Sequence, residues 1–122
     1  MKTIIILLNI IFNIGGNTTV NADDIIGKWE NPDGGRKIEI FKKDNQYFGK
    51  IISVNDKGAK VKKEDIVLKN IKFENQKWQG KFRIPAKDAD FDTEITMPNI
   101  NRLKFVASYG MMSRTKIWKR IS

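Results

Sequence analysis

Residues 77–84 read Lys77-Trp78-Gln79-Gly80-Lys81-Phe82-Arg83-Ile84, and they alternate strictly between two kinds of side chain. Trp78, Phe82 and Ile84 occupy one parity together with Gly80, whereas every position of the other parity is charged or polar. A period of two is typical of a strand with one face on a core and the other in water. The stretch therefore predicts a half-buried strand.

The same alternation returns in the segments around it. Residues 91–97 and 103–109 place apolar side chains at every second position, and shorter strands are expected at 27–30, 37–41, 46–54 and 114–121. Turn residues separate these runs at spacings of roughly eight to twelve positions, as in sandwiches and barrels. We expect an all-β fold, a small antiparallel barrel of about seven or eight strands whose closure removes exposed edges. One short helix is also expected, around residues 63–69.

The first 22 residues have the layout of a signal peptide. Lys2 supplies a positive start, residues 4–14 are almost wholly apolar, and Val20-Asn21-Ala22 forms a small-residue cleavage site. The apolar run is much shorter than the roughly 20 residues of a membrane-spanning helix, so we do not expect the protein to span a membrane. The sequence predicts a signal peptide over 1–22, a barrel domain over 23–122, and export to the periplasm or beyond the cell.

The amino-acid composition excludes the commonest catalytic side chains. The chain has 122 residues with no cysteine and no histidine, so the commonest general base, the thiol nucleophile and the usual ligands of zinc and haem are missing. Asp88, Asp90 and Asp92 alternate like the start of a calcium loop, but Thr93 and Asn99 stand where that loop needs glycine and glutamate. We expect no catalytic residues, no metal site and no cofactor, and hence no enzyme.

Four segments of the chain look familiar when taken together and in order: residues 24–29 (DIIGKW), 37–41 (KIEIF), 47–51 (YFGKI) and 113–120 (SRTKIWKR). They resemble one family of exported bacterial proteins, the domain-of-unknown-function family 2147. The resemblance implies a lipocalin-like β-barrel in the cell envelope of Gram-negative bacteria, with no settled biochemical role. Asp88-Ala89-Asp90-Phe91-Asp92 departs from the Gly-Lys-x-Tyr segment that is usual there, which puts any site shared at that turn in doubt.

Gly27-Lys28-Trp29 also resembles the Gly-x-Trp opening of lipocalins, in which an arginine of the last strand covers the tryptophan ring. Arg120 matches the position of that arginine. A guanidinium stacked on a desolvated indole contributes up to about 2 kcal/mol. The resemblance therefore implies a structural latch formed by Gly27, Trp29 and Arg120.

Two kinds of partner remain open. Tyr109, Met111 and Met112 form an apolar stretch at an expected turn, where a barrel mouth would admit a small apolar ligand or lipid; inward Trp78, Phe82 and Phe105 would line its path. Alternatively, the formal charge of +9 indicates a basic face that docks on an anionic envelope polymer or a protein partner. The cations expected on that face are Lys77, Lys81, Arg83, Arg102, Lys104, Lys116 and Lys119. Nucleic acid is not expected, because the aromatic side chains fall on the core parity.

Overall fold

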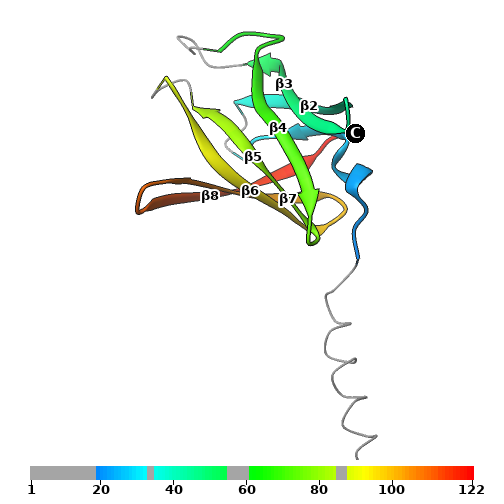
Figure 1. Ribbon diagram of the computed structural model, residues 1–122. Coiled ribbons are helices and arrows are strands. Elements are labelled where there is room, and N and C mark those ends of the chain that lie inside the picture. The colour runs from blue at the N-terminus through cyan, green and yellow to red at the C-terminus, as the bar shows by residue number, and fades with distance from the viewer. Residues whose placement is uncertain (1–18, 33–34, 55–60, 85–87) are drawn as a thin grey trace, which may run out of the picture.

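Eight antiparallel strands follow one another around a closed barrel in the order of the chain (Figure 1). The computed structural model describes residues 19–32, 35–54, 61–84 and 88–122. The strands are β1 (Gly27–Glu30), β2 (Arg36–Lys43), β3 (Gln46–Val54), β4 (Ile66–Glu74), β5 (Lys77–Ile84), β6 (Ala89–Asn99), β7 (Arg102–Tyr109) and β8 (Met112–Arg120). The predicted all-β barrel is confirmed.

The helix predicted around residues 63–69 is wrong. Lys63 and Glu64 form a turn, and β4 begins at Ile66. Val67 and Leu68 are both buried although they are neighbours, because the register between β3 and β4 shifts there. The helical segment of the described residues is instead a short 3-10 turn, η1 (Ala22–Ile25), directly before β1.

Residues 19–22 pack against one end of the barrel. The backbone N–H of Val20 donates to Gln76 Oε1 at 2.8 Å, and Gln76 Nε2 donates to the carbonyl of Val20 at 3.1 Å. The indole N–H of Trp78 donates to the carbonyl of Ala22 at 3.0 Å. The predicted signal peptide falls mostly on residues 1–18, outside the described part of the chain, so its boundary stays a prediction; cleavage after Ala22 would remove these contacts.

Large apolar side chains fill most of the barrel. Trp29 and Trp78 are fully buried, and Trp118 is nearly so. Their neighbours in the core are Ile38, Ile40, Tyr47, Ile51, Leu68, Ile71, Ile95, Leu103 and Phe105. Gly80 lets β4 approach β5 closely, because a Cβ there would overlap the side chain of Ile71 and lie 2.8 Å from the carbonyl of Lys69. A barrel of eight strands is about wide enough to be filled in this way.

The two ends of the barrel are built differently. At the end next to η1, the β2–β3 and β4–β5 connections are two-residue turns, Asp44-Asn45 and Asn75-Gln76, with positive φ at all four positions. Such turns match the right-handed twist of the paired strands. We call this the closed end and the opposite one, where β7 turns into β8, the open end.

Arg120 ties the closed end together. Its guanidinium carbon lies 4.2 Å from the ring centroid of Trp29. Nε donates to the carbonyl of Ile100 at 2.7 Å, Nη1 to that of Ile26 at 3.1 Å, and Nη2 to that of Asp24 at 2.7 Å. One side chain thus joins the last strand to the β6–β7 turn and to the segment before β1.

Gly27 makes room for this arrangement. Its φ is +151°, which side chains rarely adopt, and a Cβ there would overlap Arg120 Nη1 and lie 2.8 Å from the carbonyl oxygen of Ser122. The indole N–H of Trp29 donates to the carbonyl of Ile25 at 3.0 Å. The structure therefore brings together the three residues that the resemblance to lipocalins singled out.

A second polar contact holds η1 against β3. The hydroxyl of Tyr47 donates to Asp23 Oδ1, and Lys42 Nζ lies 3.2 Å from the same oxygen. Burial and the neighbouring carboxylate raise the pKa of Tyr47 above its ordinary value. The same hydrogen bond, aided by Lys42, lowers the pKa of Asp23. The contact therefore stabilises the fold most between the low pH at which Asp23 becomes protonated and the strongly alkaline pH at which Tyr47 ionises.

Removing the Arg120 side chain should destabilise the barrel. Arg120→Ala leaves three carbonyls and one indole face without their partner, and we expect a loss of about 2–3 kcal/mol in the free energy of unfolding. Arg120→Lys keeps the charge but replaces a planar fork by one ammonium group, so it should recover only part of the loss. Thermal and urea unfolding measure both; unchanged midpoints in the two variants would show that no latch exists.

The Tyr47 contact predicts a pH dependence. Because the folded pKa of Tyr47 is raised, its stabilisation is complete below pH 10 and is lost as the pH rises further, when unfolded tyrosine ionises but the folded side chain does not. The stability difference between the wild type and Tyr47→Phe should therefore narrow between pH 9 and pH 11 in urea unfolding. Tyr109→Phe, at an exposed tyrosine, is the control; an equal difference at both pH values would contradict the prediction.

Candidate functional site

The inward-facing side chains change character near the open end of β7 and β8. The register pairs Leu103 with Trp118, Phe105 with Lys116, Ala107 with Arg114 and Tyr109 with Met112. Directly opposed residues of antiparallel strands point to the same face. The face that carries Leu103 and Trp118 deep in the core therefore carries Ala107, Arg114, Tyr109 and Met112 beyond it.

A small hollow of about 170 Å³ lies on this face. Its lining side chains come from β5 to β8 and are mostly apolar: Ile84, Phe91, Ala107, Tyr109, Met112, Ser113 and Arg114. The rings of Phe91 and Tyr109 pack at 4.9 Å between centroids. Arg114 is the charged residue of the lining, and it makes no ion pair with another described residue. The hollow thus offers an apolar surface next to one cation.

The structure places the six predicted ligand-binding residues in four different surroundings. Tyr109 and Met112 line the hollow, whereas Met111 is fully exposed at the hairpin tip and does not line it. Phe82 and Phe105 pack against each other at 6.1 Å, one layer deeper along their strands. Trp78 lies at the closed end, six residues before Ile84 and hence about 20 Å away along β5.

Five lining residues were not predicted from the sequence: Ile84, Phe91, Ala107, Ser113 and Arg114. The alternation had placed the first three on the inward parity, so only their position near the mouth was lacking. Arg114 follows from the turn: if Gly110 and Met111 form a two-residue connection, Tyr109 pairs with Met112 and Ala107 with Arg114. That register was the signal that could have found it.

Two larger hollows on the surface are polar. One, of about 480 Å³, lies between the start of β4 and the end of β5, and its lining includes Lys69, Arg83 and Asp88. The other, of about 780 Å³, runs across the outer side of β4 to β7 over lysines, carboxylates and amides. Charged groups in both hollows form ion pairs with acidic or basic neighbours. Their charges are therefore partly neutralised, whereas Arg114 at the apolar hollow forms no ion pair with a described residue.

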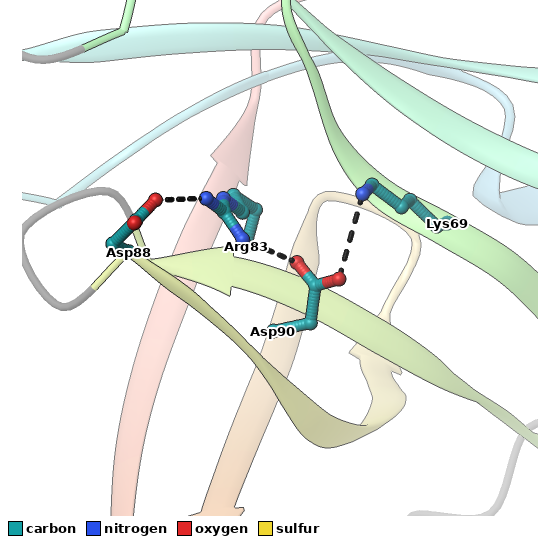
Figure 2. Close-up of polar contacts among 4 residues, drawn as sticks. All are labelled: Lys69, Arg83, Asp88 and Asp90. Carbon is teal, nitrogen blue, oxygen red and sulfur yellow. Dashed lines mark hydrogen bonds and ion pairs between the residues drawn. The ribbon is translucent and has the colours of Figure 1, made fainter.

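The aspartates that alternate at positions 88, 90 and 92 are partners of basic side chains. Figure 2 shows Arg83 between Asp88 and Asp90, and Lys69 on the other side of Asp90. Arg83 Nη1 lies 3.4 Å and Lys69 Nζ 3.5 Å from Asp90, while Lys81 pairs with Asp92. Within the described ranges, no three acidic side chains gather in a group that could hold a metal ion.

These pairs also divide the predicted basic face. Lys77, Lys81 and Arg83 of β5 form ion pairs with Glu94, Asp92 and the aspartates of Figure 2. Arg102, Lys104 and Lys119 of β7 and β8 have no such partner among the residues that the structure describes. Within the predicted basic face, these cations of the last hairpin thus differ from those of β5 in forming no ion pair with a described residue.

Comparison with solved structures places the fold in a known class. The structure "Protein HP1028 from the human pathogen Helicobacter pylori belongs to the lipocalin family" is similar with a TM-score of 0.64 at 20% sequence identity, over 80% of this chain and 83% of that one. The fold is accordingly lipocalin-like.

The family follows from the sequence match. A family model described as an uncharacterized protein conserved in bacteria (DUF2147) matches residues 27–120, and the chain belongs to this family, as predicted. No curated protein is significantly similar to it. No helix in the described ranges has the length and apolarity needed to cross a membrane.

Because the aspartates already have basic partners, calcium should not bind them strongly. Millimolar calcium should shift the melting temperature by less than about one degree, since a ligand stabilises only in proportion to its occupancy of the folded state. Asp90→Asn should lower stability by less than about 1 kcal/mol, as is usual for exposed ion pairs. Differential scanning calorimetry with and without calcium checks both; a rise of several degrees that Asp90→Asn abolishes would reveal a calcium site.

Proposed function

We propose that the protein is a non-enzymatic, exported binding protein that holds a small amphipathic anion at the open end of its barrel. The observation that carries this proposal is the apolar hollow, whose described lining residues include Arg114 and no acidic side chain. Apolar walls with a few well-placed polar groups are typical of small-molecule sites. The lipocalin-like fold supports the proposal, because barrels of this size can hold one small ligand near the mouth.

The size of the hollow limits what it can take. Sites for drug-sized ligands enclose about 300–1,000 Å³, so a hollow of about 170 Å³ would hold only part of such a molecule. An apolar segment would pack between Phe91, Ala107 and Met112, and its anionic end would meet Arg114. The core beneath, with Phe105 against Trp118 at 5.4 Å, leaves the segment no path toward the closed end.

The second candidate is a module that docks its basic face on an anionic polymer or a protein. The cations of β7 and β8 support it, but those of β5 already have acidic partners. The dependence of binding on ionic strength distinguishes the two candidate functions. Binding of an apolar segment in the hollow should survive high ionic strength, whereas docking between exposed charges should weaken steeply as they are screened.

Filling the hollow should abolish ligand binding. We expect the wild type to bind decanoate, and Ala107→Phe to weaken this binding about tenfold or more, because a phenyl ring would occupy the site of the acyl segment. Val106→Phe, at the next residue but on the outer face, is the matched control and should bind normally. Isothermal titration calorimetry measures all three; identical affinities in the two variants would contradict binding in the hollow.

Arg114 should select for the anionic group. Arg114→Gln is expected to weaken decanoate binding about fivefold, the scale of an exposed ion pair, and to leave the binding of decanol unchanged. Equal losses for the acid and the alcohol would show that Arg114 contributes shape and not charge.

A further inference from the structure

The last hairpin carries cations and no acids. From Asn101 to the C-terminus the sequence holds Arg102, Lys104, Arg114, Lys116, Lys119 and Arg120, with no aspartate or glutamate. The strands before it differ, since β5 and β6 face each other with ion pairs such as Lys81 with Asp92. The sector formed by β7 and β8 therefore carries a net positive charge.

The tip of this hairpin is apolar. Tyr109 and Met112 are 65% and 69% exposed, and Met111 between them is fully exposed. Gly110 completes the turn with a φ of +62°. In Figure 1 the tip lies at the far left, on the side of the barrel opposite η1 and the C-terminus. A soluble protein rarely leaves such a contiguous apolar group in water without a use for it.

Apolar and charged side chains follow one another in a fixed order along one face. Tyr109 and Met112 are opposite each other at the tip, and the exposed Arg114 faces Ala107 two residues farther back. Two residues of a strand span about 6.6 Å. An apolar tip with a cation one such step behind it matches the depth order of a lipid surface, whose anionic groups lie outside its apolar interior.

We propose that the β7–β8 tip inserts into an anionic lipid surface, with Met111 and Met112 in its apolar edge, Tyr109 at the level of the headgroups, and Arg114 next to lipid phosphates. A lipid surface fits both halves of the hairpin. A soluble polyanion would satisfy the cations but leave the methionines in water, whereas anionic lipid removes them from water as well. Tyr109, Met112 and Arg114 also line the hollow, but Met111 does not, so variants at Met111 test the insertion separately from the proposed ligand site.

Fluorescence tests the insertion directly. The native Trp29, Trp78 and Trp118 are 0%, 0% and 3% exposed, so they give a constant background, and a tryptophan introduced by Met111→Trp reports on the tip. Vesicles of phosphatidylglycerol and phosphatidylcholine should shift its emission to shorter wavelength, and lipids brominated on their acyl chains should quench it. Emission that stays at the wavelength of the protein in buffer would overturn the proposal.

Binding strength tests the role of the apolar side chain. Met111→Asp should weaken sedimentation with the anionic vesicles about tenfold or more, because it replaces a buried apolar side chain by a charge of the same sign as the lipid. Ile100→Asp is the matched control: Ile100 is 53% exposed in the β6–β7 turn at the closed end, and this variant should bind like the wild type. An equal loss in both variants, or in neither, would contradict insertion at the tip.

Two further measurements distinguish binding to lipid from binding to other anions. Vesicles of phosphatidylcholine alone should bind much less protein than anionic ones, and dextran sulfate should bind the wild type and Met111→Asp with a difference of less than about threefold, the effect of one exposed charge. If dextran sulfate instead discriminates between these variants as strongly as the vesicles do, the tip recognises anions in general and the lipid proposal fails. Loss of decanoate binding with normal vesicle binding would affect the proposed ligand site alone.

Discussion

Closure of the sheet between β1 and β8 depends on the contact of Arg120 with Trp29. The seam itself is short, with Trp29 opposite Arg120 and Glu30 opposite Lys119. Backbone hydrogen bonds between Lys28 and the last two residues extend it only slightly. The side chain of Arg120 adds one stacked contact and three hydrogen bonds, which reach the β6–β7 turn and the segment before β1. This arrangement requires glycine at position 27, because the Cβ of any other residue would occupy the space taken by the guanidinium.

The closed end is tightly packed, so the surfaces available for binding lie at the open end. Near η1, Trp29 and Trp78 donate their indole N–H groups to carbonyls of Ile25 and Ala22, so even the polar atoms of the core are satisfied. Toward the β7–β8 turn the inward face passes from Phe105 to Ala107, and the change from a large to a small side chain opens the hollow. The same hairpin then continues into exposed apolar residues. The fold is thus stabilised at one end, while the surfaces offered to ligands lie at the other.

The sequence was sufficient to predict the barrel and insufficient to locate the hollow. Strict alternation at positions 77–84 identifies a strand from local pattern alone, and the resemblance of Gly27-Lys28-Trp29 to the opening of lipocalins predicts the contact of Trp29 with Arg120. The expected helix at 63–69 failed because a register shift buries the adjacent Val67 and Leu68, which breaks the period of two. Trp78 was assigned to the ligand path since parity gives the face of a residue but not its depth along the barrel. Ala107 gives no signal by itself; its importance comes from the large neighbours that surround it.

The order of the strands has a kinetic consequence. Each strand from β1 to β8 pairs with its neighbour along the chain, so seven of the eight pairings of the barrel join consecutive strands, six of them through connections of two to five residues. The eighth joins parts that are far apart in sequence: Arg120 and Ile26, which it binds, are separated by 94 positions. Local pairings form early in folding and distant ones late. An open, curved sheet would therefore precede the barrel, and the insertion of Arg120 would be among the last events that convert the one into the other.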